Sequence, residues 1–165
     1  MIVSIATLGP FGKLKAPGTW GSVVGLVWWI FVVQKLAQPR GWVHEICFDG
    51  LVVLAAIFIC GAAAELLKKK DPSEVNLDEM AALPLVFFQN SLASSVTLYG
   101  WVILLVGFGL FRFFDILKPL GIRWVENLPG GWGIVVDDVL AAIYANLTLH
   151  LIIWGLFHFK IISIL

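Results

Sequence analysis

Four long apolar segments require this chain to fold in a membrane. They run from Trp20 to Leu36, Ile46 to Leu67, Leu98 to Leu117 and Val139 to Phe157. A helix needs about 20 mainly apolar residues to cross the hydrocarbon core of a bilayer. Only 13% of the residues are charged, whereas soluble domains carry about 25%. We therefore expect an all-α fold, a polytopic membrane helical bundle with four clear spans, in which residues 1–165 form a single domain.

A fifth apolar segment, Met80 to Phe88, is short and contains Pro84. Proline inside a helix bends or ends it, so this segment is either a short kinked span or a re-entrant piece. Just before it, the sequence "DPSE" has the features of a helix start. Asp71 suits the N-cap, Pro72 the first helical position, and Glu74 follows three residues after the cap. We expect a short helix to begin there.

The charged residues gather in three polar segments, Pro10–Ser22, Lys68–Glu79 and Arg112–Asp138. If these segments share one side of the membrane, that side holds Lys13, Lys15, Lys68, Lys69, Lys70, Arg112, Lys118 and Arg123. The other side then holds Lys35, Arg40 and Lys160. The excess of Lys and Arg predicts that the polar side is cytoplasmic. Most of the acidic residues fall there as well, which is more typical of a site than of a solubilising surface.

Two pairs of adjacent acids stand out, Asp78-Glu79 and Asp137-Asp138, with Asp115 between them in the sequence. Ionised side chains are costly near hydrocarbon, and clustered carboxylate oxygens suit hard cations such as Mg²⁺. The alternative is helix capping, because Asp is favoured at N-caps and in first turns. One acid would suffice for a cap, so the pairs favour a metal site.

The sequence "FRFFDILKP" places Arg112 and Asp115 on one face of a helix that Pro119 ends at Lys118. Arg and Lys turned toward one point could hold a phosphate beside a metal ion. The alternative is an ordinary Arg112–Asp115 ion pair, with Lys118 extending to lipid headgroups.

Two glycine-rich segments precede apolar helices. "APGTWGS" supplies the hydroxyls of Thr19 and Ser22, and "GGWG" lets the backbone of residues 130–133 approach a ligand. Helix N-termini attract phosphate, but neither segment alone is a specific signal, and a flexible turn at the membrane surface better explains "GGWG".

Together these motifs resemble the phosphatidylglycerophosphatase A family. They are "PGTWGS" at 17–22, "DE" at 78–79, "FRFFDILKPLGIR" at 111–123 and "GGWGIVVDD" at 130–138, in the family's order. The resemblance covers about residues 8 to 145. It departs from the family at Ala81-Ala82, where a glycine is usual, at Glu126-Asn127, where Asp-Arg is usual, and at Ala141-Ala142, where Ala-Gly is usual. The change at Glu126 weakens any ligand role for that residue.

The resemblance implies a Mg²⁺-dependent lipid phosphatase of the bacterial inner membrane that converts phosphatidylglycerol phosphate to phosphatidylglycerol and faces the cytoplasm. It implies that Mg²⁺ is held by Asp78, Glu79, Asp137 and Asp138. It further implies catalytic roles for Asp137, Asp138, Asp115 and Arg112, and substrate binding by Lys118, Arg123, Thr19 and Ser22. It does not single out the general base, the number of metal ions or an oligomeric state, and we expect no nucleic-acid partner.

Two other functions stay open at this point. Acidic residues within spans also line ion paths, so a small cation channel or transporter is one alternative. Because Arg and Lys recognise phosphate whatever alcohol carries it, a phosphatase for another lipid phosphate is the other.

Overall fold

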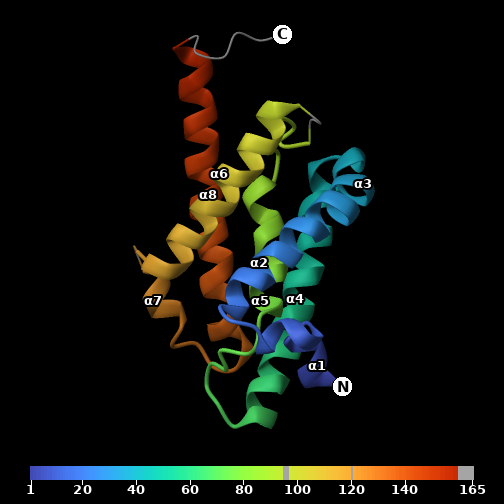
Figure 1. Ribbon diagram of the computed structural model, residues 1–165, viewed down its shortest axis with the longest axis vertical. Coiled ribbons are helices and arrows are strands. Elements are labelled where there is room, and N and C mark those ends of the chain that lie inside the picture. The colour runs from blue at the N-terminus through green and yellow to red at the C-terminus, as the bar shows by residue number, and fades with distance from the viewer. Residues whose placement is uncertain (95–96, 120, 160–165) are drawn as a thin grey trace.

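The computed structural model describes residues 1–94, 97–119 and 121–159, and every regular element in those ranges is helical (Figure 1). Four helices in this part of the chain are long and apolar enough to cross a membrane. They are Pro17–Arg40, Trp42–Leu67, Leu98–Leu117 and Gly131–His158. The expected all-α fold with four spans is therefore confirmed.

The first span consists of several short helical elements, whereas each of the three later spans is one continuous helix. It contains α2 (Pro17–Trp28), a π-helical turn η2 (Trp29–Val33), α3 (Gln34–Leu36) and a 3-10 turn η3 (Gln38–Arg40). The later spans are α4 (Trp42–Leu67), α6 (Leu98–Leu117) and α8 (Gly131–His158). The remaining short elements are α1 (Ile2–Ala6), η1 (Gly9–Lys13), α5 (Leu77–Ala82), η4 (Leu83–Phe87) and α7 (Ile122–Val125).

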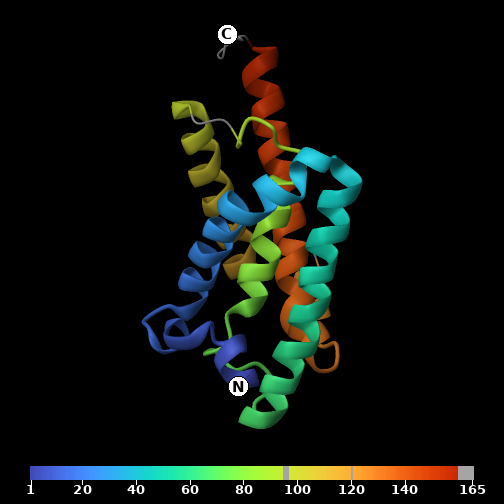
Figure 2. The ribbon, with the colours of Figure 1, turned by 90° about the vertical axis from the view of Figure 1, so that its right-hand side faces the viewer.

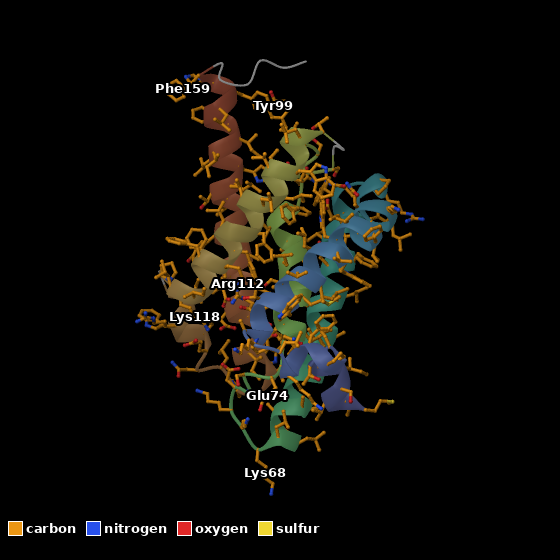
Figure 3. All side chains as sticks on the ribbon, in the orientation of Figure 1. Lys68, Glu74, Tyr99, Arg112, Lys118 and Phe159 are labelled. Carbon is orange, nitrogen blue, oxygen red and sulfur yellow. The ribbon has the colours of Figure 1, made fainter. Side chains whose placement is uncertain are left out.

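Successive spans run in opposite directions, so all three polar segments meet at one end of the bundle (Figures 1 and 2). Arg112, Lys118, Glu74 and Lys68 lie toward this end, which we call the polar end, whereas Tyr99 and Phe159 lie at the other (Figure 3). Lys35 and Arg40 belong to α3 and η3 at that opposite end. Lys160 is outside the described residues.

The fifth apolar segment forms α5 and η4, a broken helix in the middle of the bundle that leads the chain away from the polar end (Figures 1 and 2). It is kinked, as Pro84 predicts, and Leu83, Val86 and Phe87 are fully buried. The Nδ2 of Asn146, on α8, donates to the carbonyls of Val86 at 2.9 Å and Phe88 at 3.1 Å. Irregular backbone at membrane depth is tolerated where protein surrounds it and satisfies its polar groups.

The short helix expected at Asp71 is absent from the described residues, so that prediction is wrong. Residues 71–74 form a turn closed by the Val75 amide, which donates to the Pro72 carbonyl at 2.9 Å, and α5 begins only at Leu77. The Asn76 amide donates to the carbonyl of Ala6, and Val75 is buried. These tertiary contacts fix a turn where the local capping signal favoured a helix.

Close contact between helices depends on small residues at the crossings. A Cβ atom on Gly131 would lie 1.8 Å from the Ile57 carbonyl oxygen of α4. A Cβ atom on Gly107 of α6 would lie 2.5 Å from the Phe87 ring. The outer surface carries exposed apolar side chains such as Leu51 and Phe58, as expected of a surface that faces lipid.

Candidate active site

The last span begins earlier than its apolar run suggests, and this places both aspartates inside it. Asp137 and Asp138 lie beyond the first turn of α8, which contains no acid, and both side chains are buried. They therefore do not cap the helix. With 28 residues, α8 is about 42 Å long at 1.5 Å per residue, against a hydrocarbon core of about 30 Å. The helix is thus long enough for its first turns to lie at the membrane surface.

Two helices bring three carboxylates together at the polar end. Asp78 and Glu79 occupy the first turn of α5, and Asp138 comes from α8. One oxygen from each of the three lies within 4.8 Å of the others. Asp78 Oδ1 and Glu79 Oε2 are buried and accept no hydrogen bond from the described residues. Three converging acids with unpartnered oxygens match the hard oxygen ligands that Mg²⁺, Ca²⁺ and Mn²⁺ prefer.

Asp78 and Glu79 lie outside the four spanning helices, and burial makes the ionised form of both carboxyls unfavourable. Burial raises the pKa of Asp78 above its ordinary value. Burial, followed by the neighbouring negative charge of Asp78, raises the pKa of Glu79 well above its ordinary value. A cation bound between the three acids would lower both pKa values, because a nearby opposite charge favours the ionised carboxylate.

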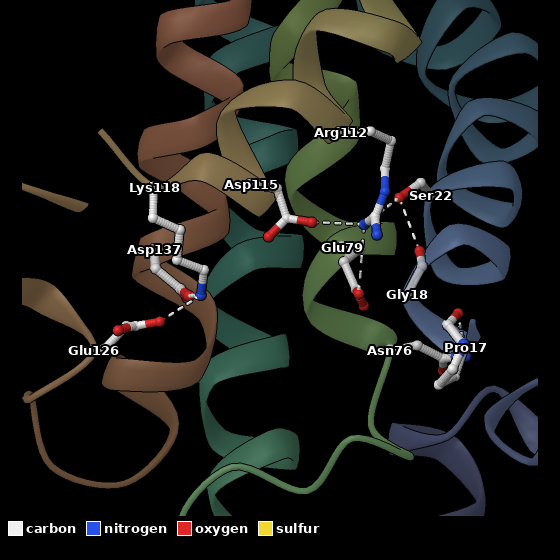
Figure 4. A network of polar contacts seen from close by, with 10 residues as sticks. All are labelled: Pro17, Gly18, Ser22, Asn76, Glu79, Arg112, Asp115, Lys118, Glu126 and Asp137. Atoms are coloured by element: carbon white, nitrogen blue, oxygen red, sulfur yellow. Dashed lines mark hydrogen bonds and ion pairs between the residues drawn. The ribbon is translucent and has the colours of Figure 1, made fainter. Parts of the chain in front are cut away.

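Arg112, on α6, connects the carboxylate cluster to α2 (Figure 4). Its Nη1 lies 2.6 Å from Asp115 Oδ2 and 3.8 Å from Glu79 Oε1. The same nitrogen donates to Ser22 Oγ at 3.3 Å, and that hydroxyl donates to the Gly18 carbonyl at 2.9 Å. The three-residue spacing predicted that Arg112 and Asp115 share one face of the helix, and the ion pair between them was the alternative to a phosphate site. These contacts hold the guanidinium in a fixed position beside the acids.

Lys118 follows α6 as its C-cap and joins two further carboxylates (Figure 4). Its Nζ lies 2.6 Å from Asp137 Oδ2 and 2.5 Å from Glu126 Oε1. Burial would lower the pKa of Lys118, but the hydrogen bonds that its ammonium donates to Asp137 and Glu126 outweigh burial and raise the pKa above its ordinary value. Asp137 thus pairs with a lysine and is not one of the three clustered carboxylates. The sequence did not indicate the contact between Lys118 and Glu126.

A pocket of about 310 Å³ opens among these side chains, and we call it the acidic pocket. Among the described residues, its ionisable lining is six acids and two bases: Asp71, Asp78, Glu79, Asp115, Asp137, Asp138, Arg112 and Lys118. The excess of negative charge favours a bound cation, and the two bases provide a place for an anion beside it. The pocket can therefore hold a divalent metal ion and a phosphate group together.

The glycine-rich start of α2 closes one side of the acidic pocket. A Cβ atom on Gly18 would lie 2.1 Å from Glu79 Oε1, and one on Gly21 would lie 2.5 Å from the Asn76 carbonyl oxygen. These glycines allow α2 to pack directly against α5. Ser22 contacts Arg112, whereas Thr19 is absent from the described lining of the pocket.

Arg123 does not reach the acidic pocket. It is exposed on α7 and lines a separate hollow of about 330 Å³ with Leu117, Lys118, Pro119, Gly121 and Trp124. Lys118 lines both spaces. Arg112 and Lys118 thus line the acidic pocket, whereas Arg123 lines the neighbouring hollow.

The sequence is similar to known proteins over most of its length. A family model described as Phosphatidylglycerophosphatase A matches residues 4–153. A phosphatidylglycerophosphatase A from Haemophilus influenzae is 35% identical over 79% of this chain and 74% of its own. The Escherichia coli phosphatidylglycerophosphatase A is 27% identical over 82% of this chain and 73% of its own. A Bacteroides thetaiotaomicron protein named "Putative phosphatidylinositol-3-phosphatase" is 36% identical over 84% of both chains. No solved structure matches the chain.

Proposed function

Because the chain belongs to the phosphatidylglycerophosphatase A family of phosphoric monoester hydrolases, we propose that its acidic pocket releases phosphate from phosphatidylglycerol phosphate with the help of Mg²⁺. The observation that carries the proposal is the meeting of a carboxylate cluster with Arg112 and Lys118 in one pocket. A phosphate monoester is a dianion, so its hydrolysis needs positive charge directed at the phosphoryl oxygens. Membership of a hydrolase family also argues against the channel or transporter alternative.

Each side chain has a separate role in the proposed reaction. Asp78, Glu79 and Asp138 would hold the divalent ion, which when bound supplies positive charge to the phosphoryl oxygens. Arg112 donates its planar fork of N–H groups to those oxygens, while Asp115 and Ser22 keep the guanidinium oriented. Lys118, which also lines the acidic pocket, adds a second positive charge.

The attacking group is water, and its proton passes to a carboxylate of the acidic pocket. A new P–O bond forms to the water oxygen, and the P–O bond to the headgroup glycerol breaks. The glycerol oxygen takes up a proton and leaves as an alcohol. The products are inorganic phosphate and phosphatidylglycerol, whose acyl chains can stay in the bilayer throughout.

The proposed orientation places the polar end in the bacterial cytoplasm. Basic residues of the polar segments, including Lys68, Arg112 and Lys118, gather at this end (Figure 3). Segments rich in Lys and Arg stay on the cytoplasmic side of bacterial inner membranes. The headgroup would then enter the acidic pocket from the cytoplasmic face.

Phosphatidylinositol 3-phosphate is a second candidate substrate, and the name of the Bacteroides relative is the observation that favours it. This lipid also presents a terminal phosphate monoester to the same kind of pocket. A direct comparison of the two lipids decides between them.

The test is phosphate release by purified protein in detergent micelles. Phosphatidylglycerol phosphate, phosphatidylinositol 3-phosphate and a polyprenyl phosphate are compared with Mg²⁺ and with a chelator. We expect the first lipid to be hydrolysed fastest, and only with metal. Asp138→Asn should reduce the rate at least about 100-fold, whereas Glu65→Gln, at an exposed acid of α4 outside the pocket, should not. Full activity of Asp138→Asn, or in excess chelator, would contradict the proposal.

A further inference from the structure

The hollow that contains Arg123 has no role in the reaction described above. It lies between the end of α6 and α7, and we call it the basic hollow: Leu117, Lys118, Pro119, Gly121, Arg123 and Trp124. Its charged lining in the described residues is cationic, in contrast to the acidic pocket beside it. A space of this kind suits an anion with an apolar neighbour.

We propose that the basic hollow binds the phosphodiester of the lipid, the second phosphate, which joins the headgroup to diacylglycerol. The proposal rests on the proposed function, because it assumes that the terminal phosphate reacts in the acidic pocket. In phosphatidylglycerol phosphate one glycerol unit separates the two phosphates. Two neighbouring anion sites are therefore what a lipid with this headgroup requires.

Lys118 can serve both sites because of the number of its donors. An ammonium group has three N–H donors, and Asp137 and Glu126 each accept one. The third donor is available to a phosphate in either space. Arg123 lines the basic hollow but not the acidic pocket. Its guanidinium would therefore be the main positive charge that binds the phosphodiester.

The apolar surface next to the basic hollow indicates where the acyl chains lie. Trp124 is 82% exposed and Ile116 is 70% exposed. Phe113 and Leu117 are also exposed on the same part of α6. Trp is favoured at the level of lipid headgroups. A lipid lying along the end of α6 would keep its chains against this surface and its phosphodiester beside Arg123.

The experiment compares Arg123→Gln with the unchanged protein and with Lys13→Gln. Lys13 is an exposed cation next to Gly12, which packs against the Glu74 carbonyl at the polar end (Figure 3). Three quantities are measured in micelles: KM and kcat for phosphatidylglycerol phosphate, inhibition by phosphatidylglycerol, and inhibition by inorganic phosphate. Phosphatidylglycerol carries the phosphodiester without the terminal phosphate, and inorganic phosphate carries neither glycerol nor diester.

We expect Arg123→Gln to raise KM about tenfold, the usual effect of losing one charged hydrogen bond, with kcat nearly unchanged. Competitive inhibition by phosphatidylglycerol should weaken by a similar factor, while inhibition by inorganic phosphate stays the same. Arg123→Lys should restore part of the loss, and Lys13→Gln should behave like the unchanged protein.

Three results would overturn the proposal. A loss of kcat with weaker inhibition by inorganic phosphate would put Arg123 on the reacting phosphate. Non-competitive inhibition by phosphatidylglycerol would assign the hollow to a bystander lipid. Unchanged kinetics would leave Arg123 without a role in binding. All three differ from failure of the proposed function itself, in which the unchanged protein would release no phosphate from this lipid.

Discussion

Lys118 holds two acids that come from different parts of the chain. Its Nζ contacts Asp137 on α8 and Glu126 after α7. Because these contacts raise the pKa of Lys118, the ammonium stays charged at all pH values at which the protein would be assayed. The pH profile of activity should therefore report carboxylates and not this lysine.

Replacing each member of this contact should have a different effect. Lys118→Met removes a charge from the acidic pocket and leaves the buried Asp137 without its partner. We expect kcat to fall at least about 100-fold and the free energy of unfolding to fall by about 1–3 kcal/mol. Glu126→Gln should lower kcat by no more than about fivefold, since a partly exposed ion pair contributes about 1 kcal/mol or less. Phosphate release and thermal unfolding in micelles measure both effects, and equal losses in the two variants would refute this ranking.

At the scale of single residues, the sequence predicts contacts within a helix better than contacts between segments. The Arg112–Asp115 pair follows from helical spacing. The contact of Lys118 with Asp137 joins residues 19 positions apart, and no periodicity indicates it. Glu126 was discounted because it departs from the family pattern, yet the fold of the α7 loop brings it to Lys118.

Glycines on α2 determine how closely that helix packs against α5. Gly21→Ala would place a Cβ atom 2.5 Å from the Asn76 carbonyl oxygen and 3.0 Å from Glu79 Oε2. The helices must separate, so we expect a loss of about 1–3 kcal/mol in the free energy of unfolding and weaker metal binding. Gly109→Ala on α6 is the matched control, because a Cβ atom there meets nothing within 4 Å.

Thermal unfolding with and without Mg²⁺ measures this prediction. A Gly21→Ala protein as stable and as responsive to metal as the Gly109→Ala protein would show that α2 does not position Glu79.

At the scale of elements, hydropathy found all four spans but placed the start of three of them too late. The third span, Leu98–Leu117, was predicted to the residue. The last span begins at Gly131. Its start was predicted at Val139 because Asp137 and Asp138 were taken as the edge of the membrane. Hydropathy cannot distinguish an acid that faces lipid from one buried against another helix. The turn at Asp71 was missed for a related reason, since its backbone is set by contacts with distant residues.

Across the whole molecule, the site exists because α2, α5, α6 and α8 end or begin together at the polar end (Figures 2 and 4). The sequence predicted this common side from the distribution of charge. It could not show which acids converge, and only the family resemblance joined Asp78 to Asp138. The structure groups these two with Glu79, so the stability of the whole bundle should depend on what neutralises them.

The last prediction concerns stability, pH and metal together. The pKa values of Asp78 and Glu79 are raised in the folded protein, so between their ordinary and raised values the folded state binds more protons than the unfolded state. Stability in chelator is therefore highest below about pH 4 for these two groups and falls as the pH rises through their raised pKa values. Metal binding requires the ionised acids, so Mg²⁺ should stabilise the protein more at pH 8 than at pH 5. At a metal concentration 100 times Kd, the gain in the free energy of unfolding is about 2.7 kcal/mol.

Thermal unfolding in micelles at both pH values measures this gain. The Asp78→Asn, Glu79→Gln double variant should show a smaller dependence of stability on pH in chelator and should lose the response to metal. A metal response of equal size at pH 5 and pH 8 would show that these acids do not bind the ion.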